Sequence, residues 1–178
     1  MSKIFEEQGE SHQEQTSIER ILVANRGEIA RRIIRSIHAL GMTSLAIYSE
    51  VDRDTPHVHE ADVACFLGES ESKHSYLNMD KIIEVALSND VDAIHPGYGF
   101  LSENAEFAQK VIDAGIVWIG PSPKAIALMG EKSEAKEQAK IAGVPVLEGV
   151  KIDEESTEDE RLSIIRDVGF PLLIKATY

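Results

Sequence analysis

Hydrophobic residues follow two spacings that alternate along the chain. The first apolar run, residues 21–24, is short and unbroken, which is typical of a strand buried on both faces. After the turn at residues 25–27, isoleucine and leucine recur every three or four positions up to Gly41, which predicts a helix that ends at that glycine. The patterned part of the chain therefore begins with a strand, a turn and a helix.

The alternation of strand and helix continues to about residue 119. Further strands are predicted at 44–48, 64–67, 92–95 and 116–119, and two further helices after the capping residues Asn78 and Ser102. Strands that alternate with helices form right-handed βαβ units around a parallel sheet. The predicted fold class is therefore α/β, with a doubly wound parallel sheet.

The pattern divides the chain into three parts. Residues 1–17 are polar and aperiodic, and they are predicted to form a disordered tail. Residues 18–130 carry the alternating pattern and are expected to form one domain. Residues 131–178 contain helical segments, one of them beginning at the capping-box residue Thr157, and an apolar run at 171–176 that is interpreted as a strand. This third part is expected to begin a second domain.

Composition and charge exclude several classes of protein. The chain is 43% hydrophobic and 28% charged, as in folded soluble proteins. Its formal net charge of −13 argues against a nucleic-acid surface, which needs patches of Lys and Arg. No apolar stretch approaches the roughly 20 residues that span a bilayer, and the polar amino terminus has no signal peptide. Cys65, the single cysteine, lies in an apolar run and is expected to be inert. We therefore expect a cytoplasmic protein without nucleic-acid or membrane partners.

Two turns are candidates for ligand binding. The first, at residues 25–30, has one glycine where the dinucleotide pattern G-x-G-x-x-G has three. The second, at residues 95–99, places two glycines and Tyr98 at the carboxyl end of a predicted strand, where open α/β sheets bind ligands. Composition alone favours a plain strand-to-helix turn capped by Ser102, with His95 as an interior histidine. No nearby Cys/His cluster indicates a metal.

Four longer motifs point to a known family. They are, in chain order, ILVANRGEIARRIIR, HPGYGFLSENAEFA, WIGPSPKAIALMGEKSEAK and GFPLLIKA. Together they resemble the biotin carboxylase family. Its members form the first subunit or domain of acetyl-CoA, propionyl-CoA, methylcrotonyl-CoA, pyruvate and urea carboxylases. The resemblance extends from residue 18 to residue 176. It implies a Rossmann-like pre-ATP-grasp domain over residues 18–130, followed by the first elements of an ATP-grasp domain over residues 131–178.

The resemblance also implies a reaction. In the family, ATP with Mg²⁺ or Mn²⁺ activates bicarbonate as carboxyphosphate, and the carboxylate is then transferred to biotin. The implied partners are a biotin carboxyl carrier protein or domain and a carboxyltransferase component. Neither the acyl acceptor nor the location of the carrier is indicated by these motifs.

Individual residues match positions with roles in the family. By this resemblance, Lys132 and Lys175 match lysines associated with ATP, and a lysine is a compact cation suited to phosphate oxygens. Tyr98 and Gly99 match positions beside the biotin ring. The chain departs from some members at Ser122, where they have a lysine. A nucleotide role for the nearby Lys124 is therefore not expected.

Family members commonly dimerise through the helix that follows the first turn. Arg32 and Arg35 lie on that helix, one turn apart and off its apolar stripe, and they are candidate dimer contacts. A solvated basic face explains them equally well. Ala39 stands where an acidic residue is expected, which weakens the case for an ion pair.

The resemblance further implies that parts of the catalytic machinery lie beyond Tyr178. These are the phosphate loop, the metal ligands, the bicarbonate-binding residues and the catalytic base. The chain alone is therefore expected to hold no catalytic residue and no metal ligand, and to be inactive. Two other interpretations remain open. One is another ATP-grasp ligase, such as a carbamoyl-phosphate or purine-pathway enzyme, and the other is a non-catalytic assembly module.

Overall fold

The computed structural model describes residues 17–130, 132–147, 150, 152–153 and 155–173. The predicted disordered tail lies almost wholly outside these ranges. The backbone separates into two compact units, Met1–Ser122 and Pro123–Tyr178. The domain boundary that the sequence pattern places after residue 130 stays a prediction.

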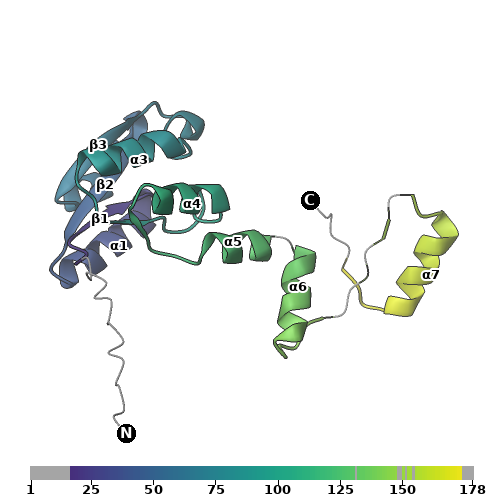
Figure 1. Ribbon diagram of the computed structural model, residues 1–178. Helices are drawn as coiled ribbons and strands as arrows, with labels where there is room; N and C mark the ends of the chain where they lie inside the picture. The colour runs from purple at the N-terminus through teal and green to yellow at the C-terminus, as the bar shows by residue number, and fades with distance from the viewer. Residues whose placement is uncertain (1–16, 131, 148–149, 151, 154, 174–178) are drawn as a thin grey trace, which may run out of the picture. The chain divides into compact units, whose positions relative to one another are not determined.

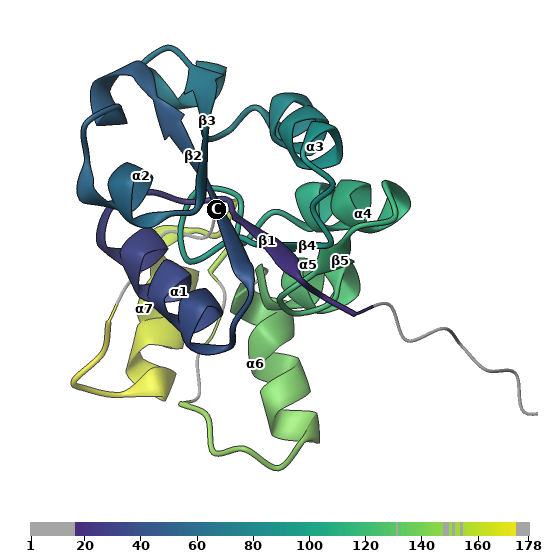
Figure 2. The same ribbon diagram turned by 90° about the vertical axis from the view of Figure 1, so that its left-hand side faces the viewer.

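A five-stranded sheet forms the centre of the first unit (Figures 1 and 2). Its strands are β1 (Arg20–Val23), β2 (Thr43–Ser49), β3 (Val63–Gly68), β4 (Ala93–His95) and β5 (Val117–Trp118). All neighbouring strands are parallel, in the order β3-β2-β1-β4-β5. The strand order reverses at β1, because the chain first adds strands on one side of it and then on the other. The predicted doubly wound α/β fold is confirmed.

Helices cover both faces of this sheet (Figure 2). They are α1 (Gly27–Ala39), α2 (Pro56–Glu60), α3 (Met79–Ser88) and α4 (Ala105–Asp113), with the 3₁₀ turns η1 (Glu50–Asp52) and η2 (Ser72–His74). The helix α1 packs on one face, and α3 and α4 pack on the other. The sequence pattern did not predict α2, because a five-residue helix is too short to show a periodicity.

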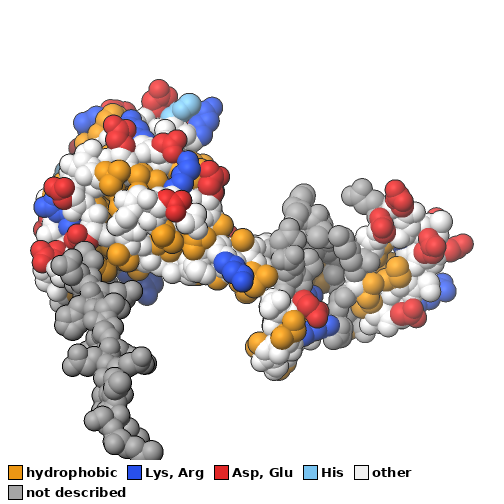
Figure 3. All heavy atoms as spheres, viewed as in Figure 1, with side chains coloured by type: hydrophobic (Ala, Val, Ile, Leu, Met, Phe, Trp, Pro, Cys, Tyr) orange, Lys and Arg blue, Asp and Glu red, His pale blue; other side chains and the backbone are white. Residues whose placement is uncertain are grey.

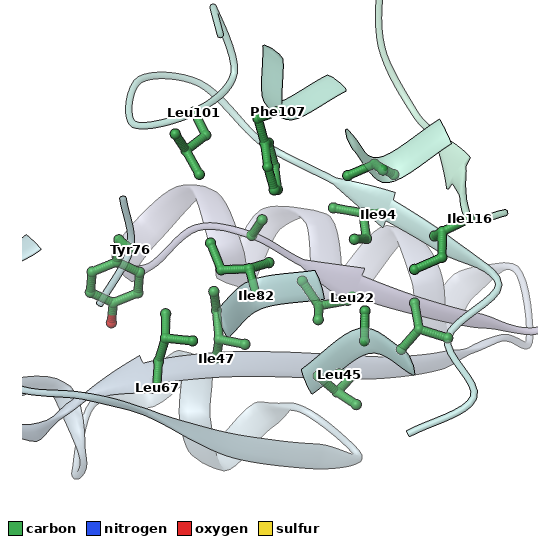
Figure 4. Close-up of a cluster of buried hydrophobic side chains, with 14 residues drawn as sticks. Leu22, Leu45, Ile47, Leu67, Tyr76, Ile82, Ile94, Leu101, Phe107 and Ile116 are labelled. Atoms are coloured by element: carbon green, nitrogen blue, oxygen red, sulfur yellow. The ribbon is translucent and has the colours of Figure 1, made fainter. Parts of the chain in front are cut away.

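The apolar run of β1 is explained by two separate cores. Successive side chains of a strand point to opposite faces, so Ile21 and Val23 pack towards α1 while Leu22 packs towards α3 and α4. Figure 4 shows the second of these cores, in which Leu22 meets Ile82. Because each face of β1 is covered, its three buried positions, 21–23, are apolar, and the half-buried Arg20 begins the strand.

Side-chain caps set where two helices begin. Asn78 caps α3 as predicted, and its side chain accepts a hydrogen bond from the Lys81 amide at 3.1 Å. The predicted cap of α4 at Ser102 is wrong, because Asn104 accepts from the Phe107 amide at 2.8 Å instead. The Ser102 amide donates to the Gly99 carbonyl at 2.9 Å, so Ser102 still belongs to the preceding turn.

The described part of the second unit is helical. It contains α5 (Pro123–Gly130), α6 (Lys132–Ile141) and α7 (Glu158–Val168). The predicted capping box at the start of α7 is present, with Thr157 and Glu160 bonded reciprocally. Residues 171–173 of the predicted last strand are not in a strand, since no neighbouring strand lies in the described part of this unit to pair with them. Residues 174–176 fall outside the described residues.

Three exposed acidic residues, Glu158, Asp159 and Glu160, lie together in the first turn of α7. On the face seen in Figure 3, acidic and basic side chains are interspersed over the first unit. None of the helices in the described ranges combines the length and the apolar character of a membrane span.

The packing of Phe107 predicts a large effect of its truncation. Its side chain is fully buried, and its ring meets Trp118 edge to face with centroids 5.6 Å apart. Phe107→Ala should lower the free energy of unfolding by about 3–5 kcal/mol, because it leaves a cavity in the core. Urea denaturation followed by circular dichroism measures this loss. Ile112→Ala, on the same helix and 44% exposed, should cost about 1 kcal/mol or less, and equal losses would contradict the packing described here.

Candidate functional site

Three loops meet at the carboxyl edge of the sheet, beside the end of β1. The loop after β1 contributes Asn25 and Arg26, the loop after β2 contributes Asp52, and the loop after β4 contributes the turn at residues 96–99. Hydrogen bonds join the first loop to both of the others. In open parallel sheets, ligands bind in the crevice where the strand order reverses, and that position lies between β1 and β4 here.

The turn after β4 has an unusual backbone. Gly97 and Gly99 have φ angles of +67° and +66°, and Phe100 has +44° although it carries a side chain. Such a conformation at a residue other than glycine costs energy and persists only where its surroundings hold it. The Phe100 ring stacks on Tyr76 with centroids 5.1 Å apart, and the side chain of Leu101 is buried. These contacts hold the far end of the turn against the core.

The near end of the turn is held by polar contacts. The Asn25 amide nitrogen, Nδ2, donates to the carbonyls of Pro96 at 2.7 Å and Tyr98 at 2.8 Å. The Gly97 amide donates to His95 Nδ1 at 3.0 Å. Burial lowers the pKa of His95, which favours the neutral ring whose Nδ1 can accept this bond. His95 therefore supports the turn, in keeping with its interpretation as an interior histidine.

The turn presents an accessible surface at its centre. Tyr98 is 64% exposed, and no atom outside residues 98–100 lies within 4 Å of the position that a Cβ on Gly99 would occupy. A planar aromatic ring beside open backbone is suited to a flat, partly apolar ligand. The structure thus places Tyr98 and Gly99 at the carboxyl edge of the sheet, next to the point where the strand order reverses.

A buried carboxylate lies at the same edge of the sheet, bonded to the loop after β1. Asp52 is 6% exposed, and Arg26 Nη1 donates to its two oxygens at 2.9 and 3.1 Å. Tyr76 Oη and Ser49 Oγ donate to Oδ2 at 2.8 and 3.0 Å. Burial opposes the charged form, but the hydrogen bonds and the Arg26 charge together outweigh it, so the pKa of Asp52 lies below its ordinary value. Burial also raises the pKa of Tyr76, which keeps the phenol protonated as a donor.

Sequence reasoning missed most of this polar network. Asn25 and Arg26 were noted as parts of a turn, and Asp52 and Tyr76 were not singled out at all. Asp52 follows the carboxyl end of a strand next to β1, so its place in the chain was a usable signal. Tyr76 gave no local signal, because its partners are 24 and 27 residues away.

The two candidate arginines lie on α1, and both side chains are exposed. Arg32 lines a hollow of about 400 Å³ beside β1. Its other lining residues are mostly apolar: Ile21, Ile29, Ile33, Ser36, Ile37, Leu40 and His95. Leu40 at its rim is 70% exposed, so this face of α1 leaves apolar surface open within the first unit.

The remaining candidates lie away from the crevice or outside the described residues. Lys132 is the first residue of α6, but its side chain is not among those described, and Lys175 lies outside the described residues. Cys65 packs against the core and burial raises the pKa of its thiol, in agreement with an inert cysteine. Among the described residues, no group of three His, Cys, Asp or Glu side chains is placed to hold a metal ion.

Comparison with known proteins identifies close relatives of the chain. A family model described as the biotin carboxylase N-terminal domain matches residues 17–126. A biotin carboxylase from Nostoc sp. is 52% identical over 159 residues, which are 89% of this chain and 35% of that protein. The alpha subunit of mitochondrial methylcrotonoyl-CoA carboxylase from Rattus norvegicus is 49% identical, over 90% of this chain and 22% of that protein.

Solved structures agree with these relatives. The biotin carboxylase domain of a thermophilic 2-oxoglutarate carboxylase matches with a TM-score of 0.79 and 44% identity, over 89% of this chain and 35% of that chain. The biotin carboxylase subunit of a pyruvate carboxylase matches with a TM-score of 0.74 and 48% identity, over 91% of this chain and 36% of that chain. The chain thus spans between 22% and 36% of the length of the relatives named here.

The environment of Asp52 predicts a pH-dependent contribution to stability. Because its pKa is lowered in the folded state, the stabilisation is complete above the ordinary value of 3.8 and is lost as the pH falls through the lower folded value. Asp52→Asn should cost about 2 kcal/mol of unfolding free energy at neutral pH, since it removes the ion pair and leaves donors unpaired.

Urea denaturation at pH 7, 5 and 3 tests this expectation. The difference between the wild-type chain and Asp52→Asn should be similar at pH 7 and pH 5 and smaller at pH 3. Asp54→Asn, at an exposed neighbouring position, should show no such trend. A difference that is independent of pH would contradict the ionised state of Asp52.

Proposed function

The chain belongs to the biotin carboxylase N-terminal domain family, and we propose that it is the amino-terminal part of an ATP-dependent biotin carboxylase. The observation that carries the proposal is the turn of residues 96–99, which presents Tyr98 and Gly99 at the carboxyl edge of the sheet, next to the point where the strand order reverses. The named relatives are biotin carboxylases and a carboxylase subunit, which favours this function over another ATP-grasp ligase or an assembly module.

In the proposed reaction, biotin is carboxylated with bicarbonate, and ATP is converted to ADP and phosphate. Bicarbonate attacks the γ-phosphorus of ATP, which forms carboxyphosphate and releases ADP. The carboxyl group then replaces the proton on N1′ of biotin, and phosphate is released with that proton. Mg²⁺ or Mn²⁺ would neutralise the phosphate oxygens during the first step. The partners that we propose are a biotin carboxyl carrier protein or domain and a carboxyltransferase component, in the cytoplasm.

Tyr98 and Gly99 would form one wall of the biotin site. The exposed Tyr98 ring offers an apolar surface to the flat ureido ring of biotin. Gly99 has no side chain, so the ligand can approach the backbone closely. These two residues would therefore bind and orient biotin without taking part in proton or phosphoryl transfer.

Lys132 and Lys175 are proposed to bind ATP. A lysine ammonium group is a compact cation that pairs well with phosphate oxygens. Lys132 is the first residue of α6, where the helix dipole also favours an anion. We propose no catalytic residue and no metal ligand within this chain, which spans 35% of its Nostoc relative.

The hollow beside α1 supports dimerisation through this helix. Its lining is mostly apolar, and exposed apolar surface with a polar rim is typical of protein interfaces. Arg32 lies in the lining, and Arg35 lies one turn further along the same helix. We propose that both arginines contact a second copy of the protein.

Truncation of Tyr98 tests the proposed function. In the full-length protein that contains this chain, the wild type should hydrolyse ATP in the presence of bicarbonate and carboxylate free biotin. Tyr98→Ala should raise the KM for biotin about tenfold, because it removes an aromatic contact, and should leave the KM for ATP unchanged. Steady-state kinetics with each substrate varied in turn measures both constants.

Two controls accompany this measurement. Phe66→Ala removes another exposed ring, on the edge strand β3, and should leave the KM for biotin unchanged. The 178-residue chain by itself should give neither activity. A full-length protein without biotin-dependent turnover would contradict the proposal.

Charge reversal on α1 tests the dimer. The full-length protein should sediment as a dimer, and Arg32→Glu with Arg35→Glu should weaken the dimer at least tenfold, because it adds carboxylates to an interface in a chain of net charge −13. Lys73→Glu, at an exposed position in η2, is the matched control and should leave the dimer intact. Equilibrium sedimentation measures the dissociation constant, and a monomeric wild type would refute the assignment.

A further inference from the structure

Asn25 joins two segments that are far apart in the sequence. It follows the carboxyl end of β1, and its side chain bonds to Pro96 and Tyr98, which are 71 and 73 residues further along. The residue is 2% exposed, so water does not compete for these bonds. Asn25 is therefore the side chain that ties the turn directly to the loop after β1.

The nitrogen and the oxygen of the Asn25 side-chain amide both have hydrogen-bond partners. Nδ2 has two hydrogens, and each has a carbonyl partner, at 2.7 Å on Pro96 and at 2.8 Å on Tyr98. Its Oδ1 accepts from the Arg26 amide at 2.9 Å. Two donors and an acceptor at this distance from the backbone are a combination that a carboxylate, a hydroxyl or an alkyl group does not provide.

Gly97 allows the Asn25 side chain to lie directly against the backbone of the turn. A Cβ at Gly97 would lie 2.8 Å from Asn25 Nδ2, closer than carbon and nitrogen atoms can approach. The turn therefore wraps around the amide with no side chain between them. Asn25 and His95 hold the backbone of residues 96–98, while Phe100 and Leu101 hold the other end of the turn against the core.

The hydrogen bond from Asn25 matters for Tyr98, because burial does not fix the position of this residue. Tyr98 is 64% exposed, so packing does not fix the residue as it fixes Leu101, which is 4% exposed. The hydrogen bond to its carbonyl restrains the backbone from which the ring projects. We propose that Asn25 is a positioning residue for biotin, which sets the place of Tyr98 and Gly99 without touching the ligand. This inference rests on the proposed function.

Asn25→Asp tests the inference in the full-length protein with free biotin as the substrate. The change keeps the size of the side chain but replaces both donors with an oxygen that repels the two carbonyls. The KM for biotin should rise about tenfold, while kcat at saturating biotin and the KM for ATP should stay within about twofold. A purely structural defect would lower kcat or the amount of active enzyme instead. Asn89→Asp is the matched control, since its Nδ2 also donates to a backbone carbonyl, that of Val85, at 2.8 Å.

A pH series adds an independent readout. When the introduced carboxyl group is protonated it regains one donor, so the ratio of the biotin KM values of Asn25→Asp and the wild type should fall as the pH is lowered. If Asn25→Asp does not fold, Asn25→Ser replaces it, since a hydroxyl has no charge and cannot reach both carbonyls. Its KM for biotin should also rise.

The possible results separate the two proposals. An unchanged KM for biotin in active Asn25→Asp or Asn25→Ser enzyme would overturn the positioning role and leave the proposed function standing. An increase of equal size in Asn89→Asp would also overturn it, because the effect would then be general. A wild-type protein without biotin carboxylation would refute the proposed function, and this inference with it.

Discussion

The burial of β1 on both of its faces is the constraint on which the rest of the first unit depends. β1 pairs with β2 on one side and β4 on the other, and α1 covers one face while α3 and α4 cover the opposite one. Residues 21–23 of the strand are therefore apolar, and polar residues such as Arg20 and Asn25 lie at or beyond its ends. At the carboxyl end of β1 the strand order reverses, and the loops after β1 and β4 meet there.

The two buried polar side chains of this site, Asn25 and Asp52, have hydrogen-bond partners at both of their polar atoms. Asp52 has donors from Arg26, Tyr76 and Ser49, and the Asn25 amide is bonded at both of its atoms. A buried polar group without a partner is costly, so each of these contacts restrains the loops that carry it. The two networks are connected, since Tyr76 both donates to Asp52 and stacks on Phe100 in the turn. The turn is thus supported from both ends while its centre stays accessible.

This division between a fixed base and an exposed centre suits a substrate-binding wall. Tyr98 and Gly99 lie on the accessible part of the turn, and the residues that hold the turn are buried beneath it. Precise placement is valuable for a reaction in which a small ring must meet an activated carboxyl group, because misplacement by about 1 Å is costly in rate. The proposal that this turn binds biotin rests on the family to which the chain belongs.

The sequence by itself determined the fold class, most of the strands and helices, and the turn that carries Tyr98 and Gly99. These follow from local patterns, such as the unbroken apolar run before Asn25 and the capping residue Asn78. Local patterns misplaced the start of α4 at Ser102, because the preceding turn takes up that residue's amide, and they missed the short α2. Only the tertiary structure decided that Asn25 forms hydrogen bonds with the turn after β4 and that Tyr76 donates one to Asp52. Those contacts join residues 71 and 24 positions apart, and no local pattern encodes which distant segments the sheet will bring together.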